Sequence, residues 1–122
     1  KVQGLDRTLA DKVFAICDYY MQDRVKKHSR HIYDIYKLLQ IVPQSDEFKA
    51  LVKEVRGVRA MTNICPSAQP DVNVPEMLNF LIENEIYKED YENITVRILE
   101  EDVSYNVAIE AVKKIAASGM FE

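Results

Sequence analysis

The sequence predicts an all-α fold, a compact bundle of about five to six helices, with a short strand remnant at the N-terminus. The chain has 122 residues, 48% of them hydrophobic, which is enough for one domain with its own core. Apolar residues recur three and four positions apart in segment after segment, as they do in amphipathic helices. Residues that commonly cap helices stand ahead of most of these segments. Residues 1–122 are therefore expected to form a single helical domain.

The first helix is expected from Asp6, its N-cap, to about Asp23. Its buried face is predicted to contain Leu9, Val13, Ile16, Cys17 and Tyr20. Lys12 lies at the edge of this face, so its aliphatic stem can lie on the core while the ammonium group reaches outward. Residues 1–5 are interpreted as the end of a strand that enters the helix.

A second helix is expected to begin after a turn at residues 24–28, with Ser29 as its N-cap. Arg30, Asp34 and Lys37 form one polar stripe along it, and nearly all of its remaining surface is apolar. A helix of this composition is largely buried, so the stripe must face either water or a site. Spacing alone favours a solvated edge on which Asp34 pairs with Arg30 and Lys37, since most helix ion pairs have no chemical role. The alternative is that Asp34 lines a cleft.

Ser45 is expected to cap a third helix with a buried face formed by Phe48, Leu51, Val52, Val55 and Val58. The opposite face carries Lys49, Lys53, Arg56 and Arg59. These residues could touch RNA or an acidic partner, but such a face is more often simply solvated. Residues 62–74 are predicted to form an ordered loop without a helix of its own. Because loops carry function disproportionately, residues 65–70 are a candidate docking segment.

Pro75, near the first helical position, is predicted to start a fourth helix. Its inward residues are expected to be Met77, Leu78, Leu81, Ile82 and Ile86. Residues 87–99 suit a helix, although residues 94–98 also alternate like a strand, and we favour the helix. Ser104 is expected to cap the last helix and Gly119 to end it. Its buried face is predicted to contain Val107, Ala108, Ala111, Val112 and Ile115.

Charge is unevenly distributed between the two halves of the chain. Residues 1–60 contain 12 Lys and Arg against 8 Asp and Glu, whereas residues 61–122 contain 4 against 12. Only the first half can attract the phosphates of a nucleotide or an RNA. Its densest basic run contains Arg24, Lys26 and Lys27, which are therefore candidate RNA-binding residues, although such a run is more often a solvated turn.

No metal site is predicted. His28 and His31 have the i, i+3 spacing that can hold a metal, but no third soft ligand accompanies them. Cys17 and Cys65 form no Cys-x-x-Cys pattern, and Cys17 is expected to be a small core residue. No apolar run approaches the roughly 20 residues that span a bilayer, and no signal peptide opens the sequence. A cytoplasmic location without a membrane partner is expected.

Two segments resemble a known family. Residues 7–13, Arg-Thr-Leu-Ala-Asp-Lys-Val, and residues 29–35, Ser-Arg-His-Ile-Tyr-Asp-Ile, resemble the last two motifs of the AbiEii-like nucleotidyltransferase toxins. This group is also called the abortive-infection or type IV toxin family. Residues 65–70 and 87–91 are similar to segments of relatives as well, and the resemblance extends to about Phe121.

In that family, a helix with an acidic residue and a lysine is followed by a helix of Arg-Asp-x-x-Asp type. Lys12, Arg30 and Asp34 match this pattern, whereas His31 stands where an acid is commoner, so no role is assigned to position 31. The resemblance implies that Lys12 and Asp34 are catalytic: Lys12 positions the triphosphate, and Asp34 orients the attacking hydroxyl or takes its proton. Lys12 and Arg30 would be the residues that bind phosphate, and Arg30 could also hold Asp34 ionised.

The resemblance also implies that the chain is the C-terminal part of a larger nucleotidyltransferase. The intact protein would transfer nucleotides from an NTP to an RNA acceptor such as tRNA, and a cognate antitoxin would be a partner. The glycine-rich turn and the paired acids that bind the metal and nucleotide in the family have no counterpart here. Mg²⁺ and NTP are therefore expected only with the N-terminal catalytic half, and this chain alone should hold neither and be inactive.

Two other interpretations remain. The first is a non-catalytic helical protein-interaction module, in which Asp34 is structural. The second, a small helix-turn-helix DNA binder, is disfavoured by the pI of 5.2 and by the lack of a short-turn recognition pair. For the transferase interpretation, Lys12 and Asp34 should differ in level by roughly 8 Å along two antiparallel helices. This difference predicts a shared cleft rather than a direct contact.

Overall fold

The computed structural model describes residues 4–122. Its elements, in chain order, are α1 (Leu5–Met21), α2 (Arg30–Leu39), α3 (Asp46–Ala60), the 3₁₀ turn η1 (Pro66–Ala68), α4 (Val74–Glu83), α5 (Lys88–Asp90), the π-helical segment η2 (Tyr91–Thr95), α6 (Val96–Ile98) and α7 (Tyr105–Ala117). No strand occurs in residues 4–122, so the predicted all-α fold is confirmed. The strand remnant expected over residues 1–5 is contradicted at position 5, where α1 begins, and positions 1–3 lie outside the described residues.

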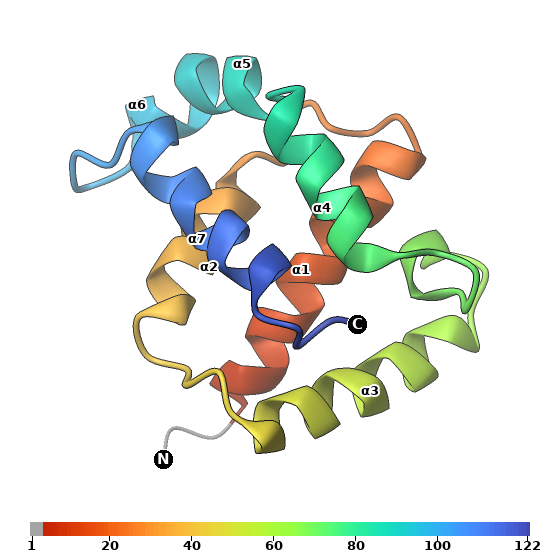
Figure 1. Cartoon of the computed structure of the whole chain (residues 1–122). Coiled ribbons are helices and arrows are strands. Elements are labelled where there is room, and N and C mark those ends of the chain that lie inside the picture. The colour runs from red at the N-terminus through yellow and green to blue at the C-terminus, as the bar shows by residue number, and fades with distance from the viewer. Residues whose placement is uncertain (1–3) are drawn as a thin grey trace.

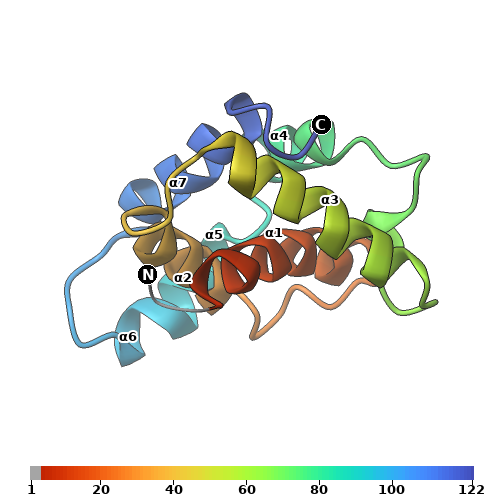
Figure 2. The same ribbon diagram turned by 90° about the horizontal axis from the view of Figure 1, so that it is seen from below.

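α1 is the central helix of the bundle (Figure 1). It packs against α2, α3, α4 and η1, while α7 packs on both α2 and α4. Figure 2 shows α3 and α7 along one side of α1, with α6 at the opposite edge. α1 therefore supplies many of the core residues, among them Leu9, Val13 and Phe14.

The core follows the predicted apolar faces. Buried residues from these faces are Leu9, Val13, Ile16, Cys17, Phe48, Val52, Val55, Leu78, Leu81, Ala108, Ala111, Val112 and Ile115. Burial raises the pKa of the Cys17 thiol, as expected for a core cysteine. Val58 and Val107 were expected to face inward but are exposed. Val58 lies in the last turn of α3, and Val107 lines a surface hollow at the start of α7.

Helices α3, α4 and α7 begin as the sequence predicts. The hydroxyl oxygens of Ser45 and Ser104 each accept a hydrogen bond from the backbone N–H three residues later. Pro75 lies in the first turn of α4, which Asn73 caps. After α7, Gly119 adopts a φ of +79°, a left-handed conformation that glycine takes without steric cost at the end of a helix.

One expected cap is wrong, and a second is confirmed in its position only. Gly4, with a φ of +89°, precedes α1, and Asp6 lies inside the first turn, where a carboxylate is stabilised by the positive end of the helix dipole. Ser29 is the N-cap residue of α2, as expected, but its side chain makes no capping hydrogen bond. Its hydroxyl instead shares a 2.7 Å hydrogen bond with the hydroxyl of Thr95, because packing against η2 buries both residues.

Residues 88–98 are continuously helical through α5, η2 and α6. The helix favoured for this region is therefore confirmed, and the alternative strand at residues 94–98 is wrong. Two buried tyrosines attach the segment to the rest of the fold. The hydroxyl of Tyr87 donates to the carbonyl of Ile16 (2.6 Å), and that of Tyr91 donates to the carbonyl of Val103 (2.9 Å).

The loop between α3 and α4 contains the short turn η1, where no helix was expected. The guanidinium group of Arg56 binds this loop by donating to the carbonyls of Ala68, Gln69 and Val72 at 2.6–3.0 Å. The predicted basic face of α3 is therefore wrong at Arg56, whose donors satisfy backbone acceptors of the loop. Lys53 does remain exposed.

Candidate functional site

Lys12 and Asp34 meet where α1 and α2 pack together. The Nζ atom of Lys12 lies 3.1 Å from Oδ2 of Asp34, so the two form a hydrogen-bonded ion pair. Their side chains are 27% and 25% exposed, which leaves both groups accessible to a ligand. Leu9 and Val13 are buried on either side of Lys12 along α1, and this packing determines the direction in which the lysine leaves the helix.

The direct contact corrects the expectation of a shared cleft without contact. That expectation placed the end of the first helix level with the start of the second. In the structure, the eight residues 22–29 separate α1 from α2, so the two helix ends need not lie at one level. The flexible four-carbon stem of Lys12 then covers the remaining separation.

Arg30 and Lys37 flank Asp34 along α2. The Nε atom of Arg30 lies 3.8 Å from Oδ1 of Asp34, so each carboxylate oxygen faces a cation. Lys37 does not pair with Asp34 as the solvated-edge interpretation expected. Its Nζ atom lies 2.8 Å from Oε2 of Glu101, which also accepts a hydrogen bond from the hydroxyl of Tyr33. Sequence reasoning missed Glu101 because no local pattern connects it to α2.

His31 lies beside the ion pair. Burial and the nearby ammonium of Lys12 lower the pKa of His31 to about 4, while Asp34 opposes this shift. Its ring stacks on Tyr19, which also stacks on His28 with ring centroids 3.8 Å apart. The buried Nδ1 atom of His31 has no hydrogen-bond partner within residues 4–122. The imidazole is therefore uncharged at neutral pH, so it leaves the charge of the pair unchanged.

Arg24, Lys26 and Lys27 are exposed on the turn that leads into α2. Asp90 holds this turn: Oδ1 accepts a hydrogen bond from the N–H of Lys27 (2.8 Å), and Oδ2 accepts one from the N–H of Ser29 (3.2 Å). Lys27 has a φ of +73°, which is uncommon for a residue with a side chain, and the bond to Asp90 helps to maintain it. The three cations thus project from an ordered turn, and RNA binding by them stays a prediction.

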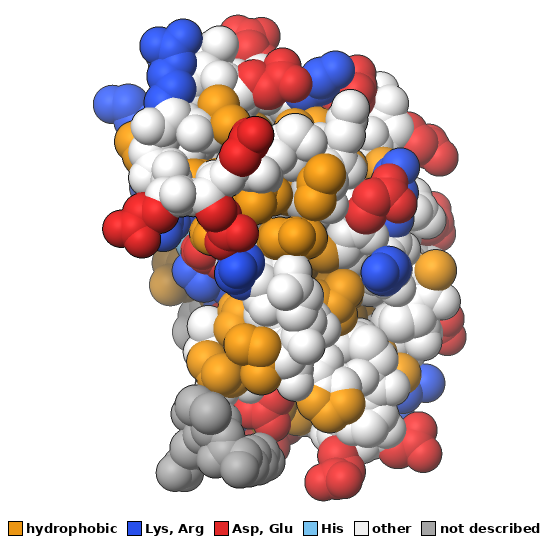
Figure 3. Space-filling view, turned by 90° about the vertical axis from the view of Figure 1, so that its left-hand side faces the viewer, with side chains coloured by type: hydrophobic (Ala, Val, Ile, Leu, Met, Phe, Trp, Pro, Cys, Tyr) orange, Lys and Arg blue, Asp and Glu red, His pale blue; other side chains and the backbone are white. Residues whose placement is uncertain are grey.

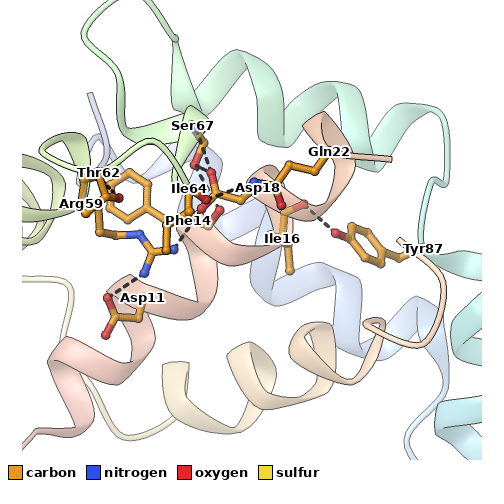
Figure 4. A network of polar contacts seen from close by, with 10 residues as sticks. All are labelled: Asp11, Phe14, Ile16, Asp18, Gln22, Arg59, Thr62, Ile64, Ser67 and Tyr87. Carbon is orange, nitrogen blue, oxygen red and sulfur yellow. Dashed lines mark hydrogen bonds and ion pairs between the residues drawn. The ribbon is translucent and has the colours of Figure 1, made fainter. Parts of the chain in front are cut away.

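A second polar cluster lies on another side of α1 (Figure 4). The Oδ2 atom of Asp18 accepts from Arg59 at 2.9 Å, and its Oδ1 atom accepts from the N–H and the hydroxyl of Ser67 at 2.8 and 2.6 Å. Arg59 also pairs with Asp11 at 3.2 Å. Asp18 is buried and its oxygens are satisfied by protein donors, so this cluster joins α1, α3 and η1 and has a structural role.

This cluster corrects two expectations. Arg59 does not belong to a solvated basic face, and the candidate docking segment at residues 65–70 is largely unavailable, because Cys65, Ser67 and Ala68 are buried. A sequence signal for the cluster did exist. Asp18 follows Phe14 by one helical turn and therefore lies beside the apolar face of α1.

Two surface hollows lie near the end of α2, and neither is lined by Lys12 or Asp34. Ile41 and Phe48 contribute to one, and Tyr36 and Val107 contribute to the other. Within residues 4–122, no group of three or more His, Cys, Asp or Glu residues could hold a metal ion. No helix in this part of the chain combines the length and the apolar character required to cross a bilayer. The Lys12–Asp34 pair is a partly exposed site between two helices.

The site combines groups that suit chemistry at phosphate. An accessible ammonium can neutralise phosphate oxygens, and a carboxylate beside it can accept a proton from a hydroxyl. Comparison with known proteins gives a match to one family model, described as nucleotidyl transferase AbiEii toxin, Type IV TA system, over residues 1–117. No curated protein and no solved structure matches the chain.

Proposed function

The chain belongs to the AbiEii family of nucleotidyl transferase toxins, and on this basis we propose that its Lys12–Asp34 pair forms part of a site that transfers nucleotides from an NTP to an RNA acceptor. The observation that supports this most is the 3.1 Å contact between Lys12 and Asp34. Residues from two helices, 22 positions apart, place opposite charges together on an accessible surface. The residues are also those that match the motifs of the family.

The two side chains have different roles in the proposed reaction. A hydroxyl oxygen of the acceptor attacks the α-phosphorus of the NTP, a new P–O bond forms, and the bond to pyrophosphate breaks. Asp34 accepts the proton of the attacking hydroxyl, an effect typically worth about 10²–10⁴ in rate. Lys12 neutralises the charge that develops on the phosphate oxygens and the leaving pyrophosphate. Arg30, with a side chain 54% exposed, provides a further phosphate contact.

Substrate binding exchanges one set of partners for another. In the free protein, Lys12 and Asp34 satisfy each other. When a triphosphate binds, the ammonium turns toward it and the carboxylate becomes available to the hydroxyl. The new contacts with the phosphates and the hydroxyl offset the loss of the contact between Lys12 and Asp34.

We propose that the chain is the C-terminal helical part of a larger transferase, whose N-terminal catalytic half would supply the Mg²⁺ ligands and further NTP contacts. Within residues 4–122, no group of His, Cys, Asp or Glu side chains fits a metal ion. The isolated chain is expected to be inactive. RNA, for example tRNA, is the proposed acceptor in the cytoplasm, and the type IV toxin–antitoxin system of the family suggests a cognate antitoxin as a partner.

Transfer of an α-labelled NTP onto tRNA by the intact protein tests the proposal. Lys12→Gln and Asp34→Asn should each lower the rate at least about 10²-fold with little change in melting temperature. The matched control Lys53→Gln removes an exposed lysine of α3 and should leave transfer unchanged. Full transfer by either site variant would reject the assignment. A large loss of melting temperature on replacing Asp34, without any effect on nucleotides, would instead favour the non-catalytic helical protein-interaction module.

A further inference from the structure

We infer that Tyr33 and Lys37 form a subsite for a backbone phosphate of the RNA acceptor, and that Glu101 occupies this subsite in the free protein. This inference rests on the function proposed above. One oxygen of Glu101 accepts hydrogen bonds from the hydroxyl of Tyr33 (2.5 Å) and from Nζ of Lys37 (2.8 Å). Lysine and tyrosine side chains are ordinary donors to phosphate oxygens of nucleic acids, so the carboxylate takes the place of one such oxygen.

The subsite lies beside the proposed reacting groups. Tyr33 immediately precedes Asp34, and Lys37 follows Asp34 by about 4.5 Å along the axis of α2. The guanidinium of Arg30 lies over the ring of Tyr33, 5.9 Å from its centroid, and extends the surface toward the basic turn. An RNA strand with its reacting hydroxyl at Asp34 can therefore place a neighbouring phosphate at Tyr33 and Lys37.

Glu101 belongs to the loop at residues 99–104, which projects from the bundle between α6 and α7 (Figure 1). Glu101 and its neighbours Glu100 and Asp102 are exposed, whereas Val103 is buried and its carbonyl accepts a hydrogen bond from Tyr91. The base of the loop is thus fixed to the fold while its acidic tip lies on the surface. The tip can leave α2 without disturbing the core.

The exposure of the Lys37–Glu101 ion pair allows RNA to replace the carboxylate. On the side of the bundle where α2 and this loop lie, acidic and basic side chains meet near the middle of the face (Figure 3). The hydrogen bond from Lys37 is the main cause that lowers the pKa of Glu101, so the tip is anionic at neutral pH. The side chains of Lys37 and Glu101 are 45% and 44% exposed, and ion pairs this exposed are weak. A polyanion that also contacts Arg30 can therefore compete with a single carboxylate.

RNA binding by the intact protein without NTP tests the inference, for example by fluorescence anisotropy of a labelled tRNA. Glu101→Gln should tighten binding about two- to fivefold, the range expected when a weak exposed pair is removed. Lys37→Gln should weaken binding and lower the slope of log affinity against log salt by about 0.7, the value for one phosphate of a single strand. The double variant should resemble Lys37→Gln. Glu100→Gln removes the same charge one residue away and should have a smaller effect.

Unchanged affinity in Glu101→Gln would overturn the inference. A gain that persists when Lys37 is also replaced would do the same, because it would show a general effect of charge. A change in affinity for the cognate antitoxin but not for RNA would assign the surface to a protein partner and equally reject a phosphate subsite. Since these measurements use no NTP, their outcome is independent of whether Lys12 and Asp34 variants retain transfer.

Discussion

The ammonium of Lys12 lies 3.1 Å from the carboxylate of Asp34, at the contact between α1 and α2. The buried side chains of Ile32 and Ile35 set the rotation of α2 against the bundle, and that rotation directs Asp34 toward Lys12. The proposed chemistry of the site therefore depends on the packing of two helices. A change that rotates or shifts α2 should separate the two charges even if neither residue is replaced.

Asp18→Asn should destabilise the protein. The substitution removes the buried negative charge that Arg59 faces at 2.9 Å, and a largely buried cation without this partner is costly. We expect a loss of about 2–3 kcal/mol in the free energy of unfolding, because Arg59 keeps its contact with Asp11. Urea unfolding followed by circular dichroism measures this change.

Asp11→Asn is the matched control, since Asp11 binds the same arginine but is 46% exposed. Its loss should stay below about 1 kcal/mol, as for other exposed pairs. An equal or larger loss for Asp11→Asn than for Asp18→Asn would show that the buried cluster does not have the structural role assigned to it.

His31 should make stability depend on pH in mildly acidic solution. Its pKa in the folded protein is lowered from 6.5 to about 4. Between these values the unfolded chain binds a proton that the folded protein does not, so His31 destabilises the fold increasingly as pH falls from about 6.5 to 4. His31→Gln removes this titration, and its stability should fall less over the same range. Because the ring is only partly buried, the difference should be on the order of 1 kcal/mol.

Chemical unfolding of both proteins at several pH values measures the difference. Titration of the carboxylates contributes to both curves, so the gap between them reports on His31. Parallel curves between pH 6.5 and 4 would mean that burial and Lys12 do not keep the imidazole neutral.

The basic turn should contribute to RNA affinity but not to the chemical step. Replacement of Arg24 and Lys26 by Gln and of Lys27 by Asn, which tolerates a positive φ, should weaken RNA binding. Three lost phosphate contacts should lower the slope of log affinity against log salt by about 2. Transfer at saturating RNA should be unchanged.

The control for this triple variant removes three lysines elsewhere on the surface: Lys49, Lys53 and Lys113. RNA affinity should respond much less to this change. If both triple variants weaken binding equally, the turn is only a solvated part of the surface, as such basic runs often are.

Most of the fold could be predicted from local signals in the sequence. Ser45 and Ser104 could be identified as caps because each acts on a backbone group three residues away. Ser29 holds the predicted N-cap position of α2, but its hydroxyl binds Thr95 instead of the helix. This bond could not be predicted, because Thr95 is 66 residues away and close only after folding. Arg56 was misassigned for the same reason: a loop that packs back onto α3 supplies its acceptors.

The residues of the candidate site could be proposed from the sequence, whereas their contacts could not. The family resemblance singled out Lys12, Arg30 and Asp34, and these three residues lie together in the structure. Whether Lys12 would touch Asp34 depends on how the turn at residues 22–29 offsets the two helices, and helical periodicity carries no information about that offset. Glu101 contacts α2 from 64 residues away, so only tertiary structure could place it there.

The central claim is that Lys12 and Asp34 take different parts in nucleotide transfer. Exchange of these two residues tests it most directly. The double variant Lys12→Asp, Asp34→Lys keeps an ion pair between α1 and α2 but moves the ammonium and the carboxylate to each other's positions. We predict that nucleotide transfer by the intact protein stays at least about 10²-fold below wild type, while the melting temperature stays close to the wild-type value. Transfer at the wild-type rate would contradict the account, because it would show that the pair only holds the helices together.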